Sequence, residues 1–130
     1  MISISPVGAT AVDDQVSLLL TIREKIRPFC VGSTIQPQVS IVYVNETPFL
    51  RDTTVFVPIQ AIVTIVTPGN NGKATTQLFT ERFIAAFQGQ TAVPATVTIQ
   101  SVGRIQGPSD ITCCKAATYS INDSITVTIA

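Results

Sequence analysis

The sequence predicts a mainly β protein, an antiparallel β-sandwich or barrel-like domain with at most one substantial helix. Three observations support this. Apolar and polar side chains alternate through most segments, which is the period of a half-buried strand. Val, Ile and Thr are the main residues of those segments, and they favour strands. Clusters of Gly, Pro, Asn and Asp separate the segments, as turns do. The length of 130 residues fits one domain, residues 1–130, that is large enough to bury a core.

The longest apolar segment, residues 55–67, is the expected centre of the fold. Its odd positions form an unbroken apolar face if the segment is extended, because strand side chains alternate between faces. We expect that face to lie in the core. The even positions are mixed but also rich in large apolar groups, so the second face needs a cover as well. Phe56, Ile62 and Val66 on that face are therefore candidate interface residues.

Proline marks both ends of this segment. Pro58 cannot donate a ladder hydrogen bond, so we expect a sheet edge or a bulge near the start of the strand. Residues 68–72, Pro-Gly-Asn-Asn-Gly, are the strongest turn signal in the chain and predict a hairpin or a sharp exit.

The earlier segments alternate in the same way. Residues 2–5 predict a short strand, residues 15–27 a half-buried strand, and residues 39–44 another strand. The outer face of residues 15–27 carries Arg23, Lys25 and Arg27, which we interpret as a solvated face. A charged turn is expected at residues 51–52, before the central segment.

Residues 76–88 are ambiguous between helix and strand. Phe79, Phe83 and Phe87 would share one face of a strand. The Ala, Glu, Arg and Gln content of residues 81–88 favours a helix instead, and a helix is the prediction. Glu81 and Arg82 are candidate interface residues on it, although such a pair is more often solvated.

After Gly89 the pattern returns to strands. We expect strands at residues 95–102, 111–121 and 124–130, with breaks at Gly103 and at residues 107–110, and a turn at residues 122–123. Strands near both ends of the chain could pair within the sheet or add to the edge of a neighbour.

No catalytic constellation is recognisable. Histidine is absent, which removes the commonest general base and metal ligand. Cys30 is a lone thiol, and Cys113 and Cys114 are adjacent, so all three are expected to behave as small apolar residues in a reducing compartment. The adjacent pair at residues 13–14, Asp-Asp, is expected to be solvated. We therefore predict no enzyme activity, no catalytic residues, no cofactor and no metal site.

Composition points to association with other proteins. Formal net charge is zero, so there is no basic excess for nucleic acid, and no segment is long and apolar enough for a membrane helix or built like a secretion signal. Charged residues make up only 12% of the chain, against about 25% in ordinary domains. Such a composition fits a β-sandwich with a Ser/Thr/Gln surface, or a subunit whose surface is largely buried in an assembly, and we favour the second interpretation.

Taken together, the Ser/Thr/Val/Ile strands, the few charges and the strands near both ends resemble a virion structural protein of a tailed bacteriophage, of the capsid decoration or cement type. The resemblance implies a homo-oligomer, often a trimer, seated on the major capsid protein or another virion protein and made in the host cytoplasm. A tail, neck or fibre component is an alternative. From a different class, a β-sandwich binding module, such as an adhesin or a small-molecule carrier, also fits.

Overall fold

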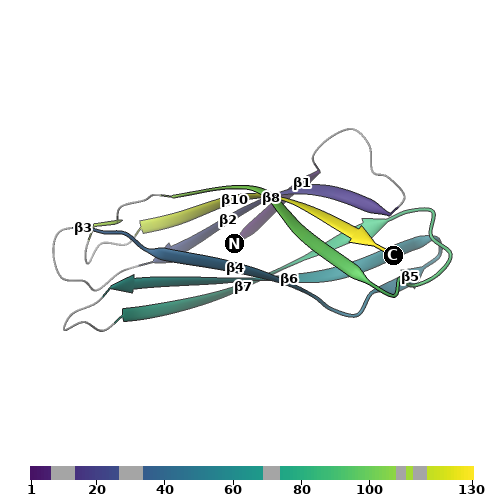
Figure 1. Ribbon diagram of the computed structural model, residues 1–130, viewed down its shortest axis with the longest axis horizontal. Helices are drawn as coiled ribbons and strands as arrows, with labels where there is room; N and C mark the ends of the chain where they lie inside the picture. The colour runs from purple at the N-terminus through teal and green to yellow at the C-terminus, as the bar shows by residue number, and fades with distance from the viewer. Residues whose placement is uncertain (7–13, 27–33, 69–73, 108–110, 113–116) are drawn as a thin grey trace.

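The computed structural model is all-β, and two antiparallel sheets pack face to face as an elongated sandwich (Figure 1). No helix occurs among the residues that the structure describes. Two short strands, β3 (Thr34–Ile35) and β9 (Ile111–Thr112), pair with each other as a separate two-stranded sheet. The described residues are 1–6, 14–26, 34–68, 74–107, 111–112 and 117–130.

The first sheet brings the two ends of the sequence together. Its strand order is β1 (Ile2–Pro6), β2 (Gln15–Ile26), β10 (Ala117–Ile129) and β8 (Val97–Gly107). The long central pair, β2 with β10, is antiparallel along almost its whole length. The two terminal strands, β1 and β10, therefore belong to the same sheet, but β2 lies between them and pairs with both.

The second sheet is built around β6 (Thr54–Pro68). β7 (Ala74–Phe87) pairs with β6 along one side over the full length of both strands. On the other side β4 (Gln38–Asn45) and then β5 (Phe49–Arg51) pair with successive parts of β6. The sheet is thus three strands wide at any point.

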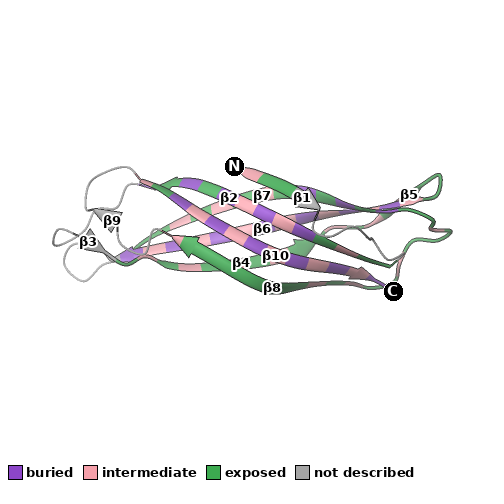
Figure 2. Ribbon diagram, turned by 90° about the horizontal axis from the view of Figure 1, so that it is seen from above, coloured by how far each residue is buried: buried purple, intermediate pink, exposed green. Residues whose placement is uncertain are grey.

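The core lies between the two sheets and consists of alternate residues from each long strand. Figure 2 shows this alternation as buried and half-buried residues along β2, β6 and β10. The prediction for the central segment is confirmed, since all six of its odd positions are buried. Those positions are Val55, Val57, Ile59, Ala61, Val63 and Ile65.

The helix predicted around residues 76–88 is wrong, because this segment is strand β7. It follows residues 68–72, so the predicted hairpin is confirmed by the β6–β7 pairing that begins with Pro68 opposite Ala74. Phe83 and Phe87 are buried and Phe79 is half-buried against the same core. Pairing along the whole of β6 and burial of these rings outweigh the modest helix propensity of the intervening residues.

Pro58 lies in the middle of the sheet, so the predicted edge or bulge is wrong. Asn45 at the end of β4 is opposite Ile59, and Phe49 in β5 is opposite Phe56. Pro58 therefore falls in the gap between β4 and β5, where its carbonyl accepts a hydrogen bond from the Glu46 backbone N–H at 2.8 Å. A proline fits a central strand here because its neighbour on that side changes at this position.

Strand β8 passes through Gly103 instead of ending there. Its register with β10 shifts between Ser124 and Ile125, which lie opposite Gly103 and Ser101. Val102 is thus the extra residue of a β-bulge. An isolated glycine within a strand pattern is a known signal for such a bulge, and the predicted break at Gly103 is corrected accordingly.

The turn predicted at residues 122–123 is also wrong, because β10 is continuous from Ala117 to Ile129. Asp123 points into the core and is fully buried. Several other expectations fall on residues outside the described ranges, and these concern the three cysteines, Asp13 and Arg27.

Candidate interaction surface

The outer face of the second sheet combines half-buried and exposed apolar side chains from all of its strands. β6 contributes Phe56, Ile62 and Val66, each half-buried, from the face opposite to the core. The neighbouring strands contribute more exposed side chains on the same face, where Val42 lies opposite Ile62 and Phe49 lies opposite Phe56. These are Val42 (55% exposed) and Val44 on β4, Phe49 on β5, and Leu78 (65%) and Ile84 (56%) on β7. We call this set of residues the apolar outer face.

The rings of Phe49 and Phe56 stack at one end of the apolar outer face. Their centroids are 5.3 Å apart with an angle of 26° between the planes. The two residues are cross-strand partners, because Asp52 turns the chain between β5 and β6 with a positive φ of 57°. Aspartate tolerates that conformation better than most residues, and the predicted charged turn at this place is confirmed.

A compact polar group interrupts the apolar outer face near its middle. Oε1 of Glu46 accepts a hydrogen bond from Nε2 of Gln60 at 2.7 Å, and it also forms an ion pair with the guanidinium of Arg82. The hydrogen bond from Arg82, followed by that from Gln60, lowers the pKa of Glu46. Because the single positive charge faces a single negative charge, this part of the surface carries no net charge for a partner to neutralise.

Glu81 lies on the other side of β7, although it is adjacent to Arg82 in sequence. Its Oε1 accepts a hydrogen bond from the Met1 amino group at 2.5 Å, and that amino group also donates to Oε1 of Glu24 at 3.0 Å. Burial raises the pKa of Glu24, and the hydrogen bond from Glu24 lowers the pKa of Glu81. This cluster joins the two sheets. The structure therefore places Phe56, Ile62, Val66 and Arg82 on one face and separates Glu81 from them.

Sequence reasoning missed the four most exposed flanking residues of this face. Val42 and Val44 fall within the strand predicted at residues 39–44, but only pairing with β6 places Val42 beside Ile62 and Val44 beside Gln60. Leu78 and Ile84 were assigned to a helix, so their alternation with the phenylalanines could not be assigned to a sheet face. The spacing of Leu78, Thr80, Arg82 and Ile84 was the available signal.

The outer face of the first sheet has a different composition. Along β10 and its neighbours the outward positions are mainly hydroxyl and amide side chains. Ile105 (76% exposed) and Val102 on β8 are its most exposed large apolar residues. Arg23 and Lys25 are exposed on β2, which confirms the sequence interpretation of a solvated basic face. The outward hydroxyl and amide residues include Ser17, Thr21, Thr98, Gln100, Ser120, Asn122, Ser124, Thr126 and Thr128.

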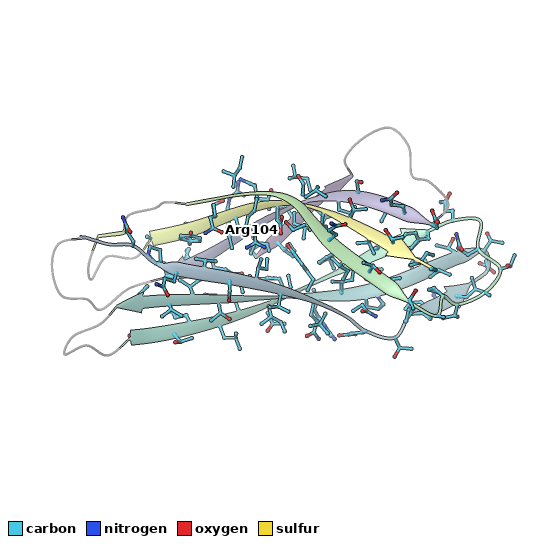
Figure 3. All side chains as sticks on the ribbon, in the orientation of Figure 1. Arg104 is labelled. Carbon is cyan, nitrogen blue, oxygen red and sulfur yellow. The ribbon has the colours of Figure 1, made fainter. Side chains whose placement is uncertain are left out.

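A polar group around Asp123 lies inside the core. Asp123 accepts hydrogen bonds from the hydroxyls of Tyr43 and Ser101, both at 2.5 Å, and Arg104 lies 3.6 Å from the same carboxylate. Tyr43 comes from the second sheet and the others from the first, so the group links the sheets. Figure 3 shows Arg104 on β8 where that strand crosses β10.

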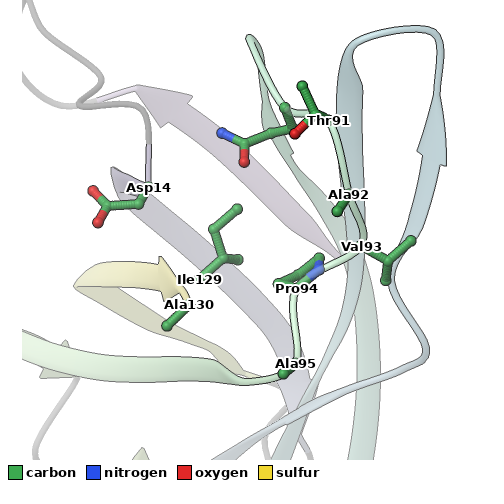
Figure 4. Close-up of a pocket in the computed structure, with 9 residues that line it drawn as sticks. Asp14, Thr91, Ala92, Val93, Pro94, Ala95, Ile129 and Ala130 are labelled. Atoms are coloured by element: carbon green, nitrogen blue, oxygen red, sulfur yellow. The ribbon is translucent and has the colours of Figure 1, made fainter.

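Two hollows open on the surface at other places. The first, of about 460 Å³, lies where the β7–β8 connection passes the end of β10 (Figure 4). Its described lining is mostly apolar, for example Val93, Pro94 and Ile129, with Asp14 as the one charged side chain. The second, of about 590 Å³, is lined by both basic residues of β2 together with Glu24 and Phe79.

Three further findings concern the residues that the structure describes. No group of three or more potential metal ligands gathers among them. They contain no helix that could span a membrane. Every buried side-chain nitrogen or oxygen among them has a hydrogen-bond partner.

The apolar outer face is thus a feature of the described surface that has no structural explanation within one chain. Comparisons with known proteins add no further information: no protein-family model matches the chain, and no match was found among curated proteins or solved structures.

Proposed function

We propose that this protein is a structural subunit of a bacteriophage particle, of the capsid decoration type, and that it docks on the capsid through the apolar outer face of its second sheet. The observation that carries the proposal is the concentration of exposed Val42, Leu78 and Ile84 on one side of the sandwich. Solvent-facing sheet sides normally carry polar residues at these alternate positions. Exposed apolar residues gathered on one face are typical of a protein interaction site.

The size of the face is suitable for a stable protein contact. β6 has 15 residues and β7 has 14, and at about 3.3 Å per residue each strand is about 45–50 Å long. Three strands spaced by about 4.8 Å give a width of about 14 Å. The product is on the order of 700 Å², close to the roughly 800 Å² that each partner contributes to a standard interface.

The chemistry of the face also suits a permanent contact. Its ionic group, Glu46 with Arg82, is internally paired, so docking would not leave an unpaired charge. Permanent interfaces are more apolar than transient ones, because their surfaces are never exposed to water after assembly. The polar outer face of the first sheet would then remain in contact with solvent.

The test is binding of the purified protein to phage heads that were assembled without it. We expect the native protein to sediment with the heads. Ile84→Asp should reduce binding at least tenfold, because a carboxylate would be buried without a partner. Ile105→Asp is the matched control, since it places the same charge at a still more exposed isoleucine on the outer face of the first sheet.

Circular dichroism and thermal unfolding of both variants establish that they fold. Failure of the native protein to bind heads would contradict the decoration role. Equal binding by Ile84→Asp and the native protein would instead contradict the assignment of the docking face.

A further inference from the structure

The sheets of a β-sandwich expose edge strands, and most of the edges here are protected against pairing with another chain. β1 is short and ends in Pro6, and β5 has only three residues. β8 carries the bulge at Val102. β7 carries Glu81 and Arg82 at its centre. Short strands, proline, bulges and charges are the usual devices that prevent edge-to-edge association.

Strand β4 lacks all of these devices. Its eight residues, Gln-Val-Ser-Ile-Val-Tyr-Val-Asn, include no charge, no proline and no glycine. Its register with β6 is continuous from Gln38 to Asn45, so it has no bulge. No described strand pairs with β4 on the side away from β6. An edge of this length and composition leaves a row of backbone donors and acceptors open for another strand.

We propose that β4 pairs antiparallel with β4 of a second copy of the chain, about a two-fold axis that makes the two second sheets continuous. A second copy fits because the strand is uncharged, so that no like charges meet when it pairs with itself. The centre of β7 does not meet this condition, because a two-fold axis at Glu81 or at Arg82 would set two like charges directly opposite one another. Two-fold contacts of one surface with itself are also the commonest form of homo-oligomer.

The register follows from the two faces of the strand. In a continuous sheet, core-facing residues of one copy must lie opposite core-facing residues of the other. A two-fold axis at Val42 satisfies this condition and pairs residues 39–45 with their equivalents. Ile41 then faces Tyr43 of the other copy on the core side. On the outer side Val42, which is 55% exposed in one chain, packs against its own copy.

This inference goes beyond the proposed function, since it concerns backbone pairing at the edge of the sheet, although Val42 belongs both to this edge and to the apolar outer face. Leu78 and Ile84 lie on β7, at the opposite margin of the sheet, and stay exposed in the paired form. Pairing would therefore join two apolar outer faces into one larger surface. Either proposal can fail while the other holds.

The test uses charge at the two-fold axis. Val42→Lys and Val42→Glu each place two like charges directly opposite one another, which destabilises a strand pair. We expect sedimentation velocity to show a dimer of the native protein and at least about a tenfold weaker dimer for each variant. An equimolar mixture of the two variants should recover the dimer, because lysine then faces glutamate. Leu78→Lys and Leu78→Glu are the matched controls and should dimerise like the native protein.

Recovery in the mixture separates loss of pairing from loss of folding, since two misfolded variants would not restore each other. The proposal is overturned if the native protein is a monomer at about 100 μM, far above the concentrations at which stable dimers form. It is also overturned if either Val42 variant dimerises as the native protein does, or if the mixture stays monomeric. Ile84→Asp should leave the dimer intact while it loses binding to heads, so the two proposals are tested separately.

Discussion

Asp123 shows how one buried carboxylate can align two sheets. It is fully buried, and unpaired burial of a charge would be costly. Hydroxyl donors from both sheets and the nearby guanidinium of Arg104 offset that cost. Burial, followed by the hydrogen bond to Asp123, raises the pKa of Tyr43 well above its usual value, so the phenol stays protonated and remains a donor. The bond is possible only when β4 and β10 have this relative position.

We predict that Tyr43→Phe lowers the free energy of unfolding by about 1.5–3 kcal/mol, the usual contribution of a hydrogen bond to a charged group. Tyr119→Phe is the matched control. Its ring is buried in the same core, but no hydrogen bond joins its hydroxyl to another described residue, so the change should stay within about 0.5 kcal/mol. Urea unfolding of the three proteins measures both values. Equal effects of the two substitutions would show that the Asp123 group does not stabilise the fold.

At the level of single elements, the energetics of β7 explain why the helix predicted at residues 76–88 is wrong. Ala, Glu, Arg and Gln favour a helix by only a few tenths of a kcal/mol each. Full burial of a phenylalanine contributes about 1.5–3 kcal/mol, and Phe83 and Phe87 reach the core only if the segment is extended. The strand is therefore the more stable conformation. Its pairing with β6 decides this, and the local sequence of β7 does not reveal that pairing.

The bulge in β8 decides which face Arg104 occupies. Ser101 and Arg104 are three residues apart and would point to opposite faces of a regular strand. The extra residue Val102 brings both to the core side, next to Asp123. Bulges often serve to redirect a side chain in this way.

Deletion of Val102 should therefore be tolerated. It removes the bulge and leaves Ser101 opposite Ile125 and Arg104 opposite Asp123, so we expect a change in unfolding free energy within about 1 kcal/mol. Deletion of Thr126 from β10 is the contrasting variant. It inverts the faces of the residues on one side of the cut, where no bulge can absorb the shift, and should prevent folding. Thermal unfolding distinguishes the two, and failure of the Val102 deletion to fold would contradict this role of the bulge.

For the whole molecule, the regular alternation of side chains was sufficient to predict the β-sandwich and the buried face of β6. The same pattern identified Phe56, Ile62 and Val66 as a second apolar face. It could not assign the flanking residues Val42 and Ile84 to that face, because strand order depends on pairing between distant segments. The predicted breaks at Gly103 and Asp123 are wrong for a related reason. The bulge beside Gly103 and the hydrogen bonds to Asp123 depend on other strands.

The two longest strand pairings of the described topology differ in how far apart their strands lie in the sequence. The β6–β7 hairpin joins neighbours in sequence, whereas β2 and β10 come from opposite ends of the chain. Closing the longer loop costs about 2–3 kcal/mol more in chain entropy. The hairpin is therefore expected to form early and the β2–β10 pairing late, with folding in milliseconds to seconds as for other sandwiches.

Val63 on β6 and Val127 on β10 test this order, because both are fully buried in the same core. Truncation of either to alanine should cost about 1.5–3 kcal/mol of stability. For Val63→Ala we expect most of that loss as slower folding, since its contacts exist in the transition state. For Val127→Ala we expect it as faster unfolding, because its contacts form afterwards. Stopped-flow folding and unfolding in urea measure the two rates separately. If Val127→Ala slows folding and Val63→Ala speeds unfolding instead, β2 and β10 pair before the β6–β7 hairpin, although the hairpin has the lower entropic cost of closure.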